Sequence, residues 1–237
     1  MSTALASFRD IVLDVIYPRH CLLTGGYIDE TSTLLASVSD LALAAEKGAP
    51  HGPALEVLLH KHVHADDFML YRVSSCWAVH RTSRIDAVIH SIKYGGRANL
   101  AVQLGTLMAG HPDMADLPPD IIIAGIPIHA ARRRERGYNQ AHLLAAGLAR
   151  ACGRQLLDEG VLTRRRYTPT QTSLDQHDRQ LNVNNAFGVR QPSLLSLRHI
   201  LLVDDVLTTG ATLNACATAL IEAGARRVDA ITACVAV

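Results

Sequence analysis

The chain is organised around residues 199–212, which read His199-Ile200-Leu201-Leu202-Val203-Asp204-Asp205-Val206-Leu207-Thr208-Thr209-Gly210-Ala211-Thr212. The apolar run from Ile200 to Val203 is typical of a strand that is buried on both faces. We expect this strand to end at Asp204 and Asp205, and a helix to begin at Ala211 after a hydroxyl-rich turn. Such a turn presents backbone N–H groups and the positive end of a helix dipole, so it favours a bound phosphate.

Hydroxyl groups from the threonines of this turn can add hydrogen bonds to the same phosphate. The two carboxylates can hold the hydroxyls of a sugar, or a hydrated Mg²⁺. Each feature alone is common, because strand ends often carry Asp and Thr-Gly is a frequent helix entrance. Their ordered combination resembles the signature with which type I phosphoribosyltransferases bind phosphoribosyl diphosphate (PRPP). It is not a Walker A loop, because the chain contains no G-x-x-x-x-G-K-[ST] sequence.

Length and composition predict a globular protein. The chain has 237 residues, of which 49% are hydrophobic and 19% are charged, enough apolar content for one domain with or without a small appendage. We expect no membrane span and no secretory signal. The five cysteines are odd in number and scattered, and Cys152, Cys216 and Cys234 lie in apolar contexts. This pattern indicates free thiols in a cytoplasmic protein.

The order of helical and strand patterns predicts the fold class. Helical spacing is found at 85–93, 100–108, 140–152 and 211–223, and strand patterns at 121–126, 161–162, 200–203 and 228–236. Residues 69–80 are expected to contain further strand, and 130–138 a basic connection. The alternation predicts an α/β fold with a mainly parallel sheet and helices on both faces. Ligands then bind beyond the carboxyl ends of the strands, where loops 126–129 and 204–212 lie.

Five ordered motifs narrow the resemblance to one family. They are 89–96 (IHSIKYGG), 126–140 (from IPI to RGYNQ), 164–179 with its arginines, 182–187 with its asparagines, and the 204–212 signature. The set resembles the ComF family of competence-associated, type I phosphoribosyltransferase-like proteins. We therefore predict a phosphoribosyltransferase domain at 85–237 and a small appendage at 1–84.

The appendage departs from the family, which usually begins with a zinc-binding region of Cys-x-x-Cys pairs. Here Cys21 is followed three residues later by Thr24, and no second pair occurs. Alternating histidines at 60, 62 and 64 would share one face of a strand, but only Cys21 could complete a four-ligand set with them. We expect no zinc site and interpret this region as a degenerate zinc-finger remnant.

The resemblance implies a role for each motif, with Mg²⁺ bound through PRPP near the paired acid. The ribose hydroxyls and metal are assigned to Asp204 and Asp205, and the 5′-phosphate to Thr208, Thr209, Gly210, Ala211 and Thr212. Pyrophosphate is assigned to the turn Pro127-Ile128-His129, with Arg132, Arg133 and Lys93, although Lys93 could instead extend from a helix end into solvent. The family also implies a strained or cis peptide in this turn. Arg164, Arg166, Gln171 and Arg179 are assigned to a flexible lid.

Two functions from different classes remain open. The first is a phosphoribosyltransferase that joins PRPP to a nucleobase or another nitrogen acceptor, although no motif marks the acceptor pocket. The second, which the family's competence role implies, is a protein that binds PRPP without catalysis or handles single-stranded DNA. Residues 121–237 hold 14 arginines and no lysine, which suits phosphate binding or a solvated basic face. The aromatic content of 4% argues against a stacking groove for DNA. A homo-oligomer is also left open.

Overall fold

The computed structural model describes residues 67–80, 83–165 and 186–237, together with Cys21, Thr24, residues 48–50, Leu55, Val57 and Leu59. Its centre is a five-stranded sheet in the order β1-β7-β6-β2-β3. The strands are β1 (Arg72–Val79), β2 (Ile122–Gly125), β3 (Gln155–Leu156), β6 (His199–Leu207) and β7 (Arg227–Ala236). All four pairings are parallel, which confirms the predicted α/β class.

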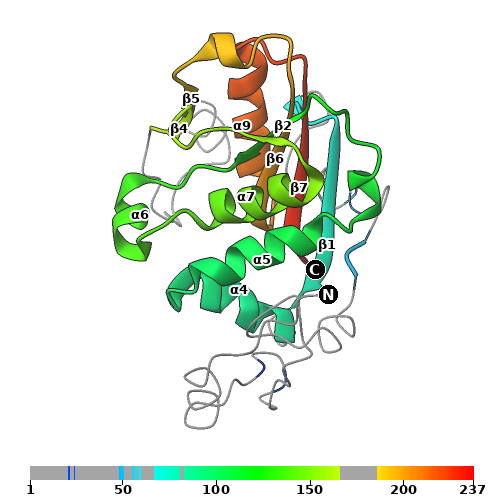
Figure 1. The fold of residues 1–237 in the computed structure, drawn as a ribbon, viewed down its shortest axis with the longest axis vertical. Coiled ribbons are helices and arrows are strands. Elements are labelled where there is room, and N and C mark those ends of the chain that lie inside the picture. Colours follow the sequence, from blue (N-terminus) through cyan, green and yellow to red (C-terminus); the bar gives the residue numbers. More distant parts are fainter. Residues whose placement is uncertain are drawn as a thin grey trace, which may run out of the picture.

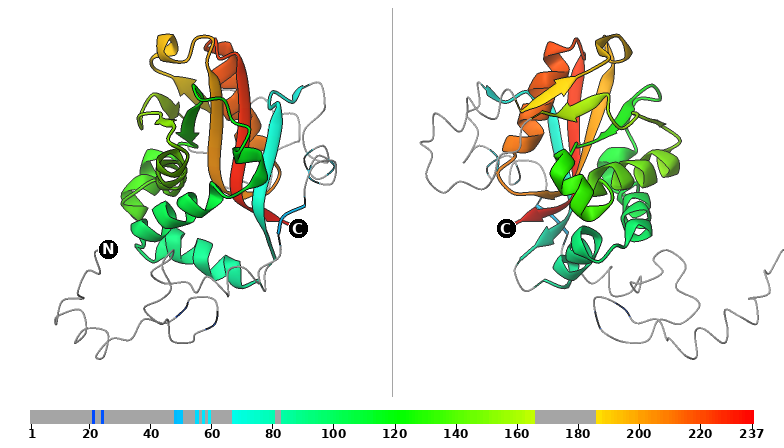
Figure 2. Two further views of the ribbon diagram at one scale, coloured as in Figure 1. Left: turned by 45° about the vertical axis from the view of Figure 1, so that its right-hand side comes forward. Right: turned by 90° about the vertical axis from the view of Figure 1, so that its left-hand side faces the viewer.

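Helices cover both faces of the sheet, as the apolar strands predicted (Figures 1 and 2). Along β6, Leu201 and Val203 pack against α4 (Arg84–Tyr94), α5 (Ala98–Met108) and α7 (Gln140–Cys152). The alternating residues Ile200 and Leu202 pack on the opposite side, with α9 (Ala211–Glu222). Neighbouring strand residues point to opposite faces, so a run of four apolar residues supplies both layers of core.

Smaller elements complete the described chain. The helix α6 (Ala130–Arg136) follows β2, and the short 3₁₀ helices η2 (Pro112–Met114) and η3 (Pro192–Leu194) precede β2 and β6. The strands β4 (Leu162–Arg164) and β5 (Phe187–Val189) form an antiparallel ribbon outside the main sheet. No helix of the described residues is both long enough and apolar enough to cross a bilayer.

Two elements differ from the expected pattern. The strand β6 extends to Leu207, so Asp204 and Asp205 lie inside a strand and not at its end. The expected basic connection contains helix α6, which buries none of its side chains. Hydrophobic periodicity cannot reveal a helix that packs no apolar face, and its ends are instead defined by local caps. The side chain of His129 accepts a hydrogen bond from Ala131 N–H, and Gly137 ends the helix in the left-handed conformation.

The sheet takes its edge strand from the segment before residue 85. The strand β1 pairs with β7 from Arg72↔Asp229 to Val79↔Ala236. Tyr71 N–H also donates to the Val228 carbonyl at 2.9 Å. The parallel sheet and this part of the N-terminal segment therefore form one hydrogen-bonded unit.

A buried charged cluster ties the beginning of β6 to β7. Nε2 of His199 lies 3.1 Å from Oδ2 of Asp229, and both side chains are 3% exposed. Arg227 donates two hydrogen bonds to the same carboxylate, at 2.9 and 2.8 Å. Burial alone would raise the pKa of Asp229, but the hydrogen bonds from His199 and Arg227 outweigh it and lower that pKa below its usual value.

We predict that Asp229→Asn lowers the free energy of unfolding by about 2–3 kcal/mol at pH 7, because it removes charge-assisted hydrogen bonds from a buried site. A carboxylate with a lowered folded-state pKa contributes stability above its unfolded pKa of about 3.9, and this contribution is lost as the pH falls through the folded value. The difference between wild type and variant should thus be constant near neutrality and shrink below about pH 4. Urea unfolding at a series of pH values measures this. Asp158→Asn, at an exposed carboxylate, should change stability by less than about 0.5 kcal/mol.

Candidate functional site

The loop between β6 and α9 has the geometry of an anion-binding turn. Gly210 is the N-cap of α9 and has φ 75°, a left-handed conformation that glycine adopts without strain. Ala211 N–H donates to the Thr209 hydroxyl at 3.4 Å, and Thr208 is exposed beside them. The helix begins at Ala211 as expected, so its free N–H groups and its positive dipole end face the carboxyl edge of the sheet.

The N-terminal segment supports this loop from outside. A Cβ atom on Gly210 would lie 2.6 Å from Cδ2 of Leu59, which is 1% exposed. One turn further along α9, the Asn214 side chain donates to the Asp67 carbonyl and accepts from Met69 N–H, both at 2.8 Å. Sequence reasoning missed this support, because no local pattern links residues separated by about 145 positions.

The paired acid is divided between the two faces of the sheet. On the side of α4, Oδ1 of Asp205 lies 3.1 Å from Nζ of Lys93. This side chain is 7% exposed, and within the described part of the chain its Oδ2 has no hydrogen-bond partner. Asp204 points to the other face, and its Oδ1 accepts from Asp205 N–H at 2.8 Å. Two adjacent residues thus present carboxylates to different elements.

Charge and burial set the protonation of this site. Burial and the neighbouring Asp205 carboxylate raise the pKa of Asp204 to about 7, against the opposing effects of Lys93 and Arg164. Burial lowers the pKa of Arg164, and the charge of Arg132 lowers it further, whereas Asp204 raises it. The Arg164 guanidinium also lies 5.4 Å from the centre of the Phe187 ring. Arg164, which was assigned to the lid, thus lies at the end of β4, and its charge acts on Asp204.

The turn at 126–129 lies directly beside the acids. It follows β2, whose Gly125 pairs with Val203 of β6, and Ile126 N–H donates to the Val203 carbonyl at 2.9 Å. Pro127 is buried, and Ile128 and His129 are partly exposed. Among the described residues there is no cis peptide, and no residue of this turn has a positive φ. The cis peptide that the resemblance suggested as one alternative is therefore not found in this turn.

The motif 136–140 connects this turn to α4. Asn139 caps α7 by accepting from Ala141 N–H, and it donates to the Ile126 carbonyl at 3.1 Å. The Tyr138 hydroxyl donates to the carbonyl of Ile92, the residue before Lys93. Sequence reasoning noted both residues as a motif but assigned them no role. Their contacts show that they hold the turn and the lysine helix in relative position.

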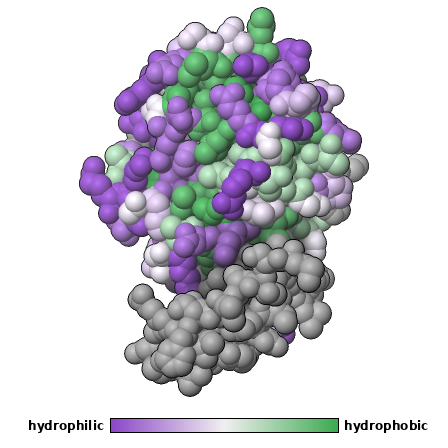
Figure 3. Space-filling model, in the orientation of Figure 1, coloured by the Kyte–Doolittle hydropathy of each residue, from purple (hydrophilic) through white to green (hydrophobic). Residues whose placement is uncertain are grey.

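The arginines of α6 are directed to different partners. Arg133 forms an ion pair with Glu159 at 2.8 Å, whereas Arg132 is exposed. Arg136 lies 5.1 Å from the centre of the Tyr94 ring. Hydrophilic residues gather over α6, at the left of the molecule in Figure 3. Of the assigned lid residues, only Arg164 is described; Arg166, Gln171 and Arg179 lie outside the described residues.

The donor atoms of this site suit a hard cation better than zinc. Asp204 and Asp205 provide carboxylate oxygens, and the unpartnered buried Oδ2 of Asp205 is available to a further group. Among the described residues, no group of three His, Cys, Asp or Glu side chains could hold a metal. Carboxylates of this number fit Mg²⁺ when a bound ligand and water supply the remaining oxygens. Cys21 is buried, and the histidines at 60, 62 and 64 lie outside the described residues, so the absence of zinc stays a prediction.

Comparison with known proteins identifies the class. Residues 139–236 match the family model described as "Phosphoribosyl transferase domain". The match contains α7 and the complete β6–loop–α9 unit, so it covers the acids and the anion-binding turn, whereas turn 126–129, α6 and Lys93 lie before it. The chain therefore has an α/β fold with a phosphoribosyltransferase-type domain.

The chain is also similar to individual proteins with known names. The chain is 35% identical over 153 residues to the "DNA utilization protein YhgH" of Salmonella typhi, covering 62% of this chain and 66% of that protein. It is 40% identical over 97 residues to "Competence protein F" of Haemophilus influenzae, covering 40% of this chain and 42% of that protein. The chain thus covers slightly less than two thirds of the first relative. A solved glutamine PRPP amidotransferase from B. subtilis is similar at 20% identity and a TM-score of 0.41, covering 61% of this chain and 30% of that one.

We predict that Gly210→Ala weakens the binding of inorganic phosphate, because the new methyl group combines left-handed backbone strain with a clash against Leu59. Gly153→Ala is the matched control: its φ is 63°, with nothing within 4 Å of the added atom. Both variants should lose about 1–2 kcal/mol of stability, but only Gly210→Ala should bind phosphate more weakly. Chemical denaturation and phosphate titration measure the two effects. Equal phosphate affinity in both variants would show that the loop does not hold the anion.

Proposed function

We propose that this chain is a ComF-type phosphoribosyltransferase-like protein that binds Mg²⁺–PRPP across loop 204–212 and turn 126–129. The observation that carries the proposal is the juxtaposition of two carboxylates, a threonine-rich turn and a helix N-terminus at the carboxyl end of one buried strand. Parallel sheets bind ligands at this edge. The match of residues 139–236 to the phosphoribosyl transferase domain supports the same class.

Each part of the site suits one part of PRPP. The N-terminus of α9 and the residues Thr208 to Thr212 bind the 5′-phosphate through N–H and hydroxyl donors. Asp204 and Asp205 accept hydrogen bonds from the ribose hydroxyls, and the Oδ2 atom of Asp205 has no other partner among the described residues. The turn 127–129 and Arg132 bind pyrophosphate, and Lys93 reaches it by exchanging its bond with Asp205. Arg133 would first have to leave Glu159.

The reaction that fits this arrangement is displacement of pyrophosphate by a nitrogen nucleophile. A bond forms between the nitrogen and ribose C1, and the bond from C1 to the pyrophosphate oxygen breaks with both electrons leaving on oxygen. The proton of the nitrogen passes to water. Lys93, Arg132 and Arg164 stabilise the negative charge that develops on the leaving group. Bound Mg²⁺ supplies further neutralisation of the diphosphate charge.

We predict that the double variant Asp204→Asn/Asp205→Asn loses at least about a hundredfold in affinity for Mg²⁺–PRPP. Asn keeps the size of Asp but cannot carry a negative charge at either position, and each lost charge-assisted hydrogen bond is worth about 1.5–3 kcal/mol. Inorganic phosphate, held by Thr208 to Thr212, should bind nearly as before. Calorimetric titration with both ligands measures this. If a folded double variant binds PRPP as tightly as wild type, the proposed role of the acids is refuted.

A second candidate is the handling of single-stranded DNA without group transfer. Arg136 of α6 lies next to Tyr94, which is 62% exposed and could stack on a base, and the other arginines of α6 are exposed. The names of two relatives refer to DNA utilization and competence.

Two assays separate these candidates. We expect pyrophosphate release from Mg²⁺–PRPP in the presence of at least one nucleobase. We also expect only weak binding of an oligothymidine, decreasing with salt. Tight oligothymidine binding without any pyrophosphate release would favour the second candidate.

A further inference from the structure

The ion pair between Lys93 and Asp205 places a positive charge on a carboxylate to which the proposed function brings a divalent cation. Nζ of Lys93 lies 3.1 Å from Oδ1 of Asp205, and the two side chains are 23% and 7% exposed. Both residues line a recess of about 440 Å³ between α4 and the ends of β1, β6 and β7. The pair is thus accessible to a ligand, and the lysine already offsets the charge of the carboxylate before any ligand binds.

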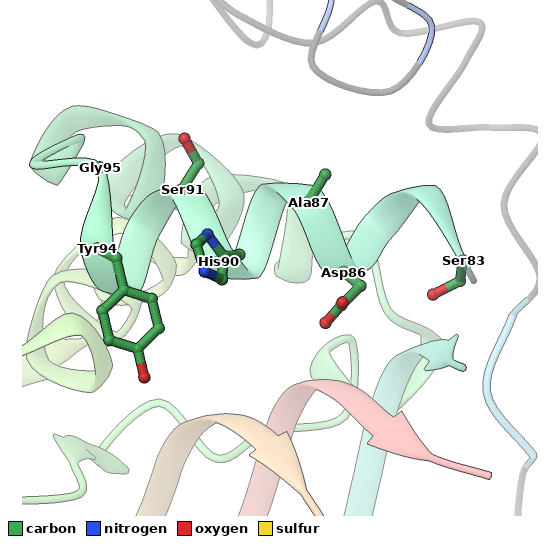
Figure 4. A pocket seen from close by; sticks show the side chains of 7 residues that line it. All are labelled: Ser83, Asp86, Ala87, His90, Ser91, Tyr94 and Gly95. Carbon is green, nitrogen blue, oxygen red and sulfur yellow. The ribbon is translucent and has the colours of Figure 1, made fainter. Parts of the chain in front are cut away.

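Lys93 is held near this carboxylate by contacts to the residues on both sides of it in α4. The Tyr138 hydroxyl donates to the carbonyl of Ile92. The Arg136 guanidinium lies 5.1 Å from the centre of the Tyr94 ring. Figure 4 shows Tyr94 in the last turn of α4, with its side chain directed towards the strands. The chain around the end of α6 therefore contacts both sequence neighbours of Lys93.

The same part of the chain is bonded to the turn at 126–129. Asn139 donates to the Ile126 carbonyl at 3.1 Å, and α6 begins directly after His129. A diphosphate bound at this turn would therefore lie next to the elements that hold Lys93. A lysine side chain has a flexible four-carbon stem, so its ammonium group can exchange one anion for another without movement of the helix.

A free divalent cation gains little at Asp205 while the lysine is in place. Among the described residues, Oδ2 of Asp205 has no hydrogen-bond partner, but Oδ1 is bonded to the Lys93 ammonium group. A cation on this carboxylate would meet a like charge at close range. An anionic ligand reverses this balance, because it offers the lysine a new partner and releases the carboxylate for the cation that accompanies the ligand.

We propose that Lys93 is a built-in counter-ion that keeps divalent cations off Asp205 until a diphosphate ligand draws the lysine away. The inference rests on the proposed function, because it concerns the same acids and the same turn, and it adds the order in which cation and ligand bind. Tyr138 is a positioning residue in this device, since its hydroxyl holds the end of α4 that carries the lysine.

Binding of Mn²⁺ alone to the full chain, measured by electron paramagnetic resonance, tests this proposal. Mn²⁺ is a hard cation that, like Mg²⁺, prefers carboxylate oxygens. Lys93→Met keeps an apolar stem and removes the charge, so it should bind Mn²⁺ at least about tenfold more tightly than wild type. Tyr138→Phe loses only the hydroxyl and should give a smaller gain. Damage to the fold would weaken binding, so a gain in affinity distinguishes this role from a merely structural one.

Matched variants show whether the gain comes from the charge at this position. Lys93→Arg keeps the positive charge and should bind Mn²⁺ as weakly as wild type. Arg84→Gln removes an exposed charge at the other end of α4 and should also behave as wild type, because distant surface charges are screened. Lys93→Gln, which is neutral but can still donate to Asp205, takes the place of Lys93→Met if urea unfolding shows that the latter is not folded.

Two results would overturn the inference. The first is a folded, neutral Lys93 variant that binds Mn²⁺ no more tightly than wild type. The second is a gain that persists in Lys93→Met/Asp205→Asn, because the cation would then bind elsewhere. A separate titration with Mg²⁺–PRPP reports on the proposed function, and Lys93→Met should bind this ligand more weakly. If wild type does not bind Mg²⁺–PRPP, the proposed function fails, whereas the Mn²⁺ titrations still show whether Lys93 keeps cations off Asp205.

Discussion

The parallel pairing of β2 with β6 is the constraint on which the site depends. Gly125 stands opposite Val203, and Ile126 N–H donates to the Val203 carbonyl at 2.9 Å. Paired strands lie about 4.8 Å apart. Two turns separated by about 80 residues in sequence therefore open side by side at one edge of the sheet. A slip of one residue in this register would exchange the two faces of β6 and bury its acids against the wrong helices.

The extension of β6 beyond the apolar run has a chemical consequence. Because Asp204 and Asp205 remain in extended backbone, their carboxylates point to different faces. Asp205 forms an ion pair with Lys93 on the side of α4, and the charges of both Lys93 and Arg164 act on Asp204. Each cation offsets part of the cost of burying a carboxylate. A ligand at this edge of the sheet would be contacted by elements of both faces, which lie far apart in the sequence. The acids thus connect the turn at 126–129, the ribbon β4–β5 and α4.

The conformation of the loop between β6 and α9 also depends on residues outside the matched domain. Leu59 occupies the space next to Gly210. The Asn214 side-chain amide donates to the Asp67 carbonyl through its nitrogen and accepts from Met69 N–H through its oxygen. These contacts, together with the pairing of β1, place part of the N-terminal segment in the support of the site. Changes in this segment can therefore alter ligand binding without touching a ligand-binding residue.

The elements with strong local signals were predictable from the residues alone. Buried strands, the helix at 140–152 and the start of α9 at Ala211 each follow from periodicity or backbone preference within a few residues, and the structure confirms these elements. Helix α6 was missed because it packs no apolar face, and the end of β6 was misplaced because acidic residues rarely continue a buried strand. The ion pair of Lys93 with Asp205, the support of Gly210 by Leu59 and the recess under α4 depend on distances between residues remote in sequence. Only the packing of the sheet and its helices sets such distances, and no local pattern encodes them.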